Sequence, residues 1–269
     1  MEISRPLSDT MHHEQRTLCK VPEITVLFWI IKILTTGTGE AVSDYVSHRL
    51  IGPGVAMIIF GGCLAISLSL QFKAHRYVTW IYWLNITLIS IFGTMVADGL
   101  RFGHVLSVII YAAVLAVILI AWYLCEKTLS IHSIYTRRRE AFYWLTILIT
   151  FALGTAAGDM TADVMNLGYV KSGFMFIGII AMPAIAYWKF GVNEIFTFWF
   201  AYIITRPLGA SFADWLISPS FRGGIELNQA VVSVVLLGII VALVTYMGFN
   251  HIDTKGRDNA EEKPQVKVL

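Results

Sequence analysis

The stretch FWIIKILTTGTGEAVSD, residues 28–44, decides the fold, because its pattern recurs without gaps from residues 82, 143 and 198. Every copy opens with an aromatic residue followed by tryptophan, at Trp29, Trp83, Trp144 and Trp199. A glycine stands ten residues after each tryptophan, at Gly39, Gly93, Gly154 and Gly209. An aspartate stands fifteen residues after it, at Asp44, Asp98, Asp159 and Asp214. Four copies of one pattern in a single chain identify a fourfold tandem repeat.

The composition around this repeat is that of a membrane protein. Of the 269 residues, 57% are hydrophobic and 14% are charged, whereas soluble domains have about 45–50% and about 25%. The few charges also gather at the ends, since 15 of the 38 lie in residues 1–24 and 250–269. A soluble enzyme, a nucleic-acid binder and a disordered protein are therefore excluded, and the net charge of +2 does not indicate a polyanionic partner.

Eight apolar runs are long enough to cross a bilayer. They are predicted at residues 24–44, 54–72, 79–98, 104–125, 142–160, 171–189, 196–214 and 228–249. An even number of spans places both tails on one side, and that side holds 14 Lys and Arg residues against four in the opposite loops. The positive-inside rule therefore predicts cytoplasmic termini, in a bacterial inner membrane.

The predicted fold is an all-α, multi-pass bundle of eight transmembrane helices in four parallel two-helix repeats. An N-terminal tail, four repeats and a C-terminal tail are expected at residues 1–23, 24–78, 79–140, 141–194, 195–249 and 250–269. Parallel repeats place the tryptophans at one depth and the aspartates roughly 22 Å away. The tryptophan pairs suit an interfacial aromatic belt, and the small residues at offsets ten and fourteen allow close helix packing. The even-numbered spans, almost purely apolar, are expected to form a lipid-facing outer ring.

Oxygen-bearing side chains gather near the end of the odd-numbered spans. One turn before the aspartate stand Glu40, Thr94 and Thr155, with Ala210 and then Ser211 in the fourth repeat. If these spans surround a common axis, the four aspartates face one another, and Glu40 and the hydroxyls add further oxygens. Such a group suits protons or hard divalent cations such as manganese. The alternative is that each aspartate caps a following segment or anchors its own helix.

Two basic residues fall inside predicted spans. Arg206 lies near mid-span and is followed by Pro207, so we expect it either to pair with an acid of another repeat, Glu40 or Asp98, or to gate a substrate path. Lys32 lies one turn from Trp29 and is expected to extend toward the cytoplasmic interface.

This set of features resembles an uncharacterised bacterial membrane-protein family with four tandem repeats, each of two transmembrane segments and a recurring tryptophan. The resemblance covers about residues 21–249. It rests on the aromatic–Trp pairs, the Gly-x-x-x-x-Asp segments, Lys20-Val21-Pro22-Glu23 and Thr205-Arg206-Pro207-Leu208-Gly209-Ala210. It implies the repeat fold and the topology, and it implies no particular reaction.

The sequence predicts a transporter-like protein that moves a small solute, foremost a divalent metal cation, through a site lined by the repeat aspartates. No enzymatic activity and no cofactor are expected, because the P-loop, HExxH, GxSxG and dinucleotide fingerprints are missing. The expected partners are the lipid bilayer and the cation, and no nucleic acid. Two alternatives stay open: a structural or sensory membrane protein that transports nothing, and an intramembrane lipid-modifying enzyme.

Overall fold

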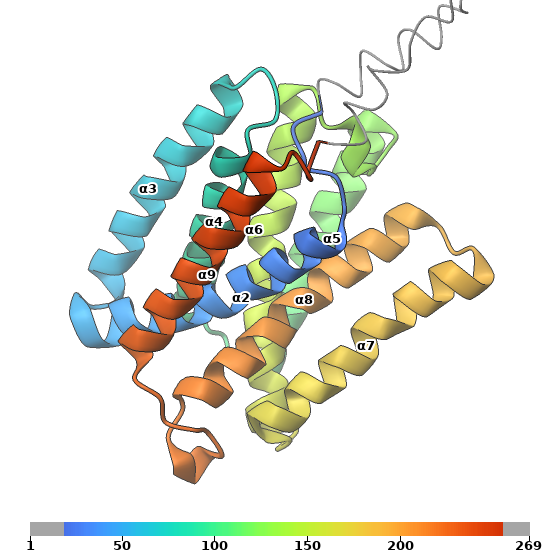
Figure 1. Cartoon of the computed structure of the whole chain (residues 1–269). Helices are drawn as coiled ribbons and strands as arrows, with labels where there is room; N and C mark the ends of the chain where they lie inside the picture. Colours follow the sequence, from blue (N-terminus) through green and yellow to red (C-terminus); the bar gives the residue numbers. More distant parts are fainter. Residues whose placement is uncertain (1–18, 255–269) are drawn as a thin grey trace, which may run out of the picture.

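The computed structural model describes residues 19–254, and this part of the chain is helical without strands (Figure 1). Its long helices are α2 (Val26–Tyr45), α3 (Pro53–Lys73), α4 (Thr79–Gly99), α5 (His104–Glu126), α6 (Arg137–Asp159), α7 (Gly168–Phe190), α8 (Glu194–Ile217) and α9 (Gln229–Phe249). Two π-helical turns, η1 (Val46–Leu50) and η3 (Met160–Val164), extend α2 and α6, and two 3-10 turns lie at η2 (Ile131–Ser133) and η4 (Ser220–Arg222). The predicted all-α bundle of two-helix repeats is confirmed.

Seven of these helices are long and apolar enough to cross a membrane, as expected of a multi-pass membrane protein. The remaining long helix, α8, has the length of a span but carries Arg206, Pro207 and Asp214 in its interior. It packs against α2, α6 and α7, so most of its polar side chains are turned toward other helices. The interior of the bundle thus accommodates the least apolar of the eight predicted spans.

The helices form two concentric rings. The first helices of the repeats close an inner ring, in which α2 packs against α4, α4 against α6, α6 against α8 and α8 against α2. The second helix of each repeat packs on the first helix of the next repeat, as α3 on α4, α5 on α6, α7 on α8 and finally α9 on α2. Burial follows this order: 61–67% of the apolar stretch is buried in α2, α4 and α6, against 22–28% in the four outer helices. Each repeat is therefore completed by its neighbour.

The aromatic–Trp pairs interlock in a circle, here called the aromatic collar. Each tryptophan stands edge-on to the aromatic residue before it, with ring centroids 5.2–5.4 Å apart. Each also meets the aromatic residue of the preceding repeat, in the pairs Phe28–Trp83 (5.5 Å), Tyr82–Trp144 (5.6 Å), Tyr143–Trp199 (6.1 Å) and Phe198–Trp29 (5.8 Å). Because one pairing recurs at all four interfaces, the inner helices run parallel at one level.

The collar corrects the expectation of an interfacial aromatic belt. Seven of its eight rings are buried, and only Trp29 is partly exposed. The rings fill the space between inner helices, because parallel helices in register bring the same large side chains together at each interface. Packing within the bundle therefore accounts for the recurring tryptophans.

A short segment before α2 also belongs to the fold. Cys19 and Val21 are buried in the same apolar core as the collar. Lys20 Nζ lies 2.7 Å from Glu140 Oε2, and the Glu23 amide donates to the Asp253 carbonyl at 3.0 Å. These contacts join the two described ends of the chain at the collar end. The described structure thus includes residues 19–23 of the predicted N-terminal tail, and residues 1–18 and 255–269 of the predicted tails lie outside the described part.

Candidate functional site

A stripe of side chains runs along the inner face of each first helix. Counted from the tryptophan, offsets 3, 7, 11 and 15 fall on one helical face. In α2 this stripe is polar throughout, and in the other inner helices it is mixed. The residues are Lys32, Thr36, Glu40 and Asp44 in α2; Ile86, Ser90, Thr94 and Asp98 in α4; Ile147, Phe151, Thr155 and Asp159 in α6; Tyr202, Arg206, Ala210 and Asp214 in α8.

The repeated glycines bring these stripes together. A Cβ atom added at Gly39, Gly93, Gly154 or Gly209 would overlap the offset-seven residue of the following repeat, which is Ser90, Phe151, Arg206 or Thr36 respectively. The same contact therefore occurs at all four interfaces of the inner ring. The absence of a side chain at offset ten lets the backbones approach, as small residues do between membrane helices.

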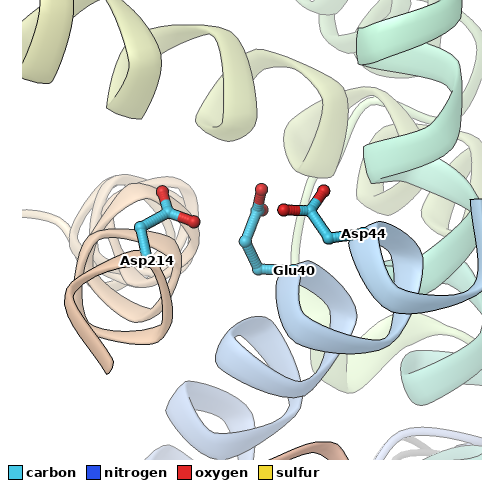
Figure 2. Close-up of side chains that lie close together, drawn as sticks. All are labelled: Glu40, Asp44 and Asp214. Carbon is cyan, nitrogen blue, oxygen red and sulfur yellow. The ribbon is translucent and has the colours of Figure 1, made fainter. Parts of the chain in front are cut away.

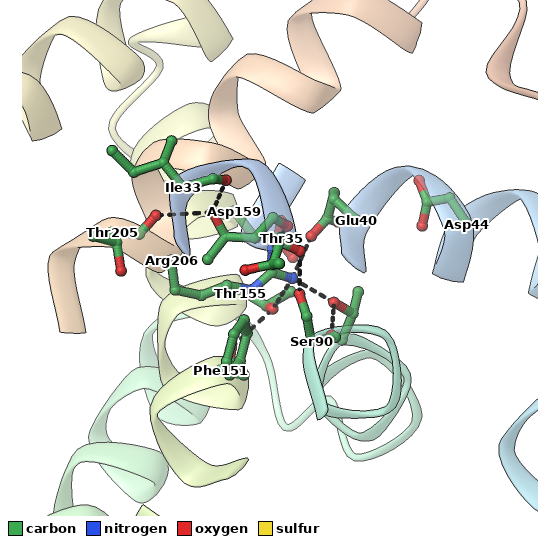
Figure 3. A network of polar contacts seen from close by, with 12 residues as sticks. Ile33, Thr35, Glu40, Asp44, Ser90, Phe151, Thr155, Asp159, Thr205 and Arg206 are labelled. Carbon is green, nitrogen blue, oxygen red and sulfur yellow. Dashed lines mark hydrogen bonds and ion pairs between the residues drawn. The ribbon is translucent and has the colours of Figure 1, made fainter. Parts of the chain in front are cut away.

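The guanidinium of Arg206 joins three of these helices (Figure 3). The residue is 1% exposed. Its Nη2 donates to Glu40 Oε2 at 2.6 Å, to Thr155 Oγ1 at 2.8 Å and to Thr94 Oγ1. Its Nη1 donates to the Thr36 carbonyl at 2.7 Å. All three polar residues at offset eleven thus bind Arg206. Of the two acids expected from the sequence as partners of Arg206, Glu40 and Asp98, the structure pairs it with Glu40.

The hydroxyl groups at this level are oriented to accept from the arginine. Thr94 and Thr155 each donate to the carbonyl four residues earlier, at 3.0 Å. Their remaining lone pairs are then free for the guanidinium. The fourth repeat has Ala210 at this offset, and its polar group comes instead from Arg206 one turn earlier. The fourth repeat thus supplies the guanidinium, and the other three repeats supply the oxygen atoms that accept its hydrogen bonds.

Three carboxylates, here called the acidic group, lie close together (Figure 2), and one of them, Glu40, pairs with Arg206. They belong to Glu40 and Asp44, one turn apart on α2, and to Asp214 on α8, and one oxygen of each lies within 4.8 Å of the others. Glu40 is 5% exposed, and the two aspartates are partly exposed. Arg206 neutralises one of the three charges. At such separations carboxylates repel one another unless a proton or a cation balances them.

The other two repeat aspartates stand apart from the acidic group. Asp159 forms an ion pair with Arg101, from the segment between α4 and α5. Asp98 is exposed. Ser211 is 2% exposed, and its hydroxyl has no hydrogen-bond partner among the described residues. The structure therefore brings together two of the four aspartates, with Glu40, in an asymmetric group.

None of the four aspartates is the N-cap residue of the next long helix, and Asp159, the N-cap residue of η3, makes no capping hydrogen bond through its side chain. The N-cap residues of α3, α5, α7 and α9 are Gly52, Gly103, Leu167 and Asn228. The structure therefore gives no support to capping, and the other form of that alternative, in which each aspartate anchors its own helix, stays open. Their shared position reflects their place at one end of the inner stripe.

Lys32 corrects a second expectation. Its side chain does not reach the interface: the residue is 1% exposed, with Nζ 4.1 Å from the ring centre of Phe151 and 4.2 Å from that of Tyr202. These cation–π contacts hold the amine between α6 and α8, and Nζ has no hydrogen-bond acceptor among the described residues. The signal that could have located it is its spacing of four from Thr36 and eight from Glu40, which places all three on one helical face.

The fold and this site define a membrane protein of tandem two-helix repeats with polar residues along the inner face of its ring. The four repeats match the family described as Repeat of Unknown Function (DUF347), over residues 27–77, 81–128, 142–192 and 197–251. The chain belongs to this family, which confirms the resemblance seen in the sequence. No curated protein and no solved structure matches the chain.

Proposed function

We propose that this protein transports a small cation, foremost a divalent metal such as Mn²⁺, and binds it through Glu40, Asp44 and Asp214. The observation that carries the proposal is their convergence: three carboxylates from two helices place oxygens within 4.8 Å of one another beside the buried arginine. Oxygen ligands of this kind match the preference of Mn²⁺ and other hard divalent cations. Ionisable groups within spans commonly mark ion pathways.

Glu40 connects cation binding to the inner stripe in this proposal. Its carboxylate belongs to the acidic group and also lies 2.6 Å from Arg206. A divalent cation held between Asp44 and Asp214 attracts Glu40 and competes with Arg206 for it. The guanidinium, otherwise held by Glu40, Thr94 and Thr155, then loses its only anionic partner among the described contacts. Arg206 serves as the gate, because its guanidinium blocks the space between the inner helices until it is released from Glu40.

The orientation of the molecule follows from its basic residues. Among residues 19–254, the segments at the collar end hold eight Lys and Arg residues against four at the acidic end. In the proposed orientation the collar faces the cytoplasm of a bacterial cell, and the acidic group faces the outer side of the inner membrane. The cation therefore reaches Asp44 and Asp214 before Arg206.

Neutral substitutions in the acidic group test the proposed site. Asp44→Asn and Asp214→Asn are each expected to weaken Mn²⁺ binding about tenfold or more, about 1.4 kcal/mol, because each removes a charged oxygen ligand. Titration calorimetry of the purified full chain measures the affinity, and Mn²⁺ entry into liposomes measures transport.

Asp98→Asn is the matched control, since Asp98 has the same place in its repeat but lies outside the acidic group. Its Mn²⁺ affinity is expected to stay within about twofold of the wild type. Equal affinities in all three variants would contradict the proposed site. Binding without any Mn²⁺ entry would contradict transport and favour a sensory role.

A further inference from the structure

We propose that Lys32 carries the proton that is exchanged for the cation, which makes the protein a cation–proton antiporter. This inference rests on the proposed function and adds its coupling. The geometry that carries it is a buried amine without an acceptor, two turns from Glu40 on the inner stripe of α2 and directly beneath the rings of Phe151 and Tyr202.

Among the described residues, the surroundings of Lys32 contain a like charge and no carboxylate. From α8 it meets the Tyr202 ring and the charge of Arg206. From α6 it meets Phe151, and the residues at its own offset in α4 and α6 are Ile86 and Ile147, both fully buried. α9, which also packs on α2, has no charged residue between Gln229 and Phe249. The two basic residues of the stripes therefore differ in their partners among the described residues. Arg206 pairs with the carboxylate of Glu40, whereas Lys32 contacts only aromatic rings.

This inequality supplies the coupling. When the cation takes Glu40, Arg206 loses its partner, and three positive groups then share the inner ring. Arginine keeps its proton in proteins, whereas a buried lysine can release its own. Proton release from Lys32 to the side where the cation entered removes one of these charges. Return of the proton after the cation has left restores the first state. One divalent cation thus moves against one proton, and each cycle transfers one net positive charge.

Buried phenol groups lie beside Lys32 and in the collar, on the side from which Lys32 would regain its proton. Tyr202, whose ring covers the amine, is fully buried, and its hydroxyl has no hydrogen-bond partner among the described residues. The hydroxyls of Tyr82 and Tyr143, 2.6 Å apart, lie in the same core. A phenol hydroxyl can both donate and accept, as a proton relay requires.

The test follows Mn²⁺ and protons together in liposomes that contain the full chain. Entrapped calcein reports Mn²⁺ entry by quenching, and entrapped pyranine reports the internal pH. In the wild type, Mn²⁺ entry is expected to make the interior more alkaline, with one proton leaving per ion. Lys32→Met is expected to lower proton release per Mn²⁺ at least about tenfold while Mn²⁺ affinity stays within about twofold. Lys32→Arg, whose charge is permanent, is expected to stop Mn²⁺ entry and to keep Mn²⁺ binding.

Ile86→Met is the matched control, because it places methionine at the same offset of the second repeat. It is expected to keep the wild-type ratio of protons to Mn²⁺. An unchanged ratio in Lys32→Met, or Mn²⁺ entry with proton release in Lys32→Arg, would overturn the role of Lys32.

If the wild type moves Mn²⁺ without protons, the role of Lys32 fails and the proposed transport of Mn²⁺ stands. If the wild type moves no Mn²⁺, the proposed function fails and the role of Lys32 fails with it. Retained Mn²⁺ binding shows that a variant is folded.

Discussion

Replacing Arg206 by methionine is expected to lower the free energy of unfolding by about 3–5 kcal/mol, the usual cost of removing one partner from a buried ion pair. Arg206 and Glu40 are 1% and 5% exposed, so water cannot replace the lost contact. Glu40 would then lie beside Asp44 and Asp214 without the guanidinium that pairs with it. Unfolding of the full chain in mixed micelles, followed by tryptophan fluorescence, measures the effect.

A double variant separates the ion pair from simple loss of packing. Adding Glu40→Met to Arg206→Met is expected to recover at least about half of the lost stability, because a buried pair replaced by apolar residues is often nearly neutral. Asp98→Asn serves as the charge control, since it removes an exposed carboxylate at the end of α4. Additive losses in the double variant would show that Arg206 and Glu40 do not stabilise each other.

Introducing valine at Gly209 is expected to lower the free energy of unfolding by about 3 kcal/mol, at the upper end of the usual cost of overpacking. Its Cβ would lie 2.8 Å from the Ile33 carbonyl oxygen and 2.9 Å from Thr36 Cβ. Neither atom is the end of a flexible side chain, so α2 and α8 must separate. That movement also lengthens the contact between Arg206 and the Thr36 carbonyl. The same unfolding measurement detects the change.

Gly238→Ala in α9 is the contrasting control for the inner glycines. Gly238 lies inside a helix and is exposed, with no atom within 4 Å of an added Cβ. Alanine there is expected to be neutral or to stabilise by up to about 1 kcal/mol, because glycine is the weaker helix former. Gly209→Ala is expected to destabilise by about 1–3 kcal/mol. Equal effects at the two sites would contradict the close approach of α2 and α8.

Local pattern predicted most of the architecture. Long apolar runs require helices in a bilayer, and an even number of spans per unit requires parallel repeats. The spacing from tryptophan to aspartate places each kind of residue at one level of the bundle, and the collar contacts confirm this for the aromatic rings. The expectation of an interfacial position was wrong for Trp83, Trp144, Trp199 and Lys32, which are buried. Periodicity places a residue on a particular face of its helix. Whether that residue is buried depends on the side chains that the neighbouring helices place opposite that face.

The repeat by itself determined the helices, their common direction and the candidate polar residues, because these depend on residues close together in the chain. Only the tertiary structure decided which equivalent residues meet. Arg206 and Glu40 are 166 residues apart and are joined because α8 closes the ring against α2. Four repeats of one pattern allow a symmetric site, but one arginine in the fourth repeat and one glutamate in the first make the charges unequal. Asp44 flanks Glu40 because it lies one turn away on α2, and Asp214 flanks it because α8 packs against α2, while Arg101 engages Asp159.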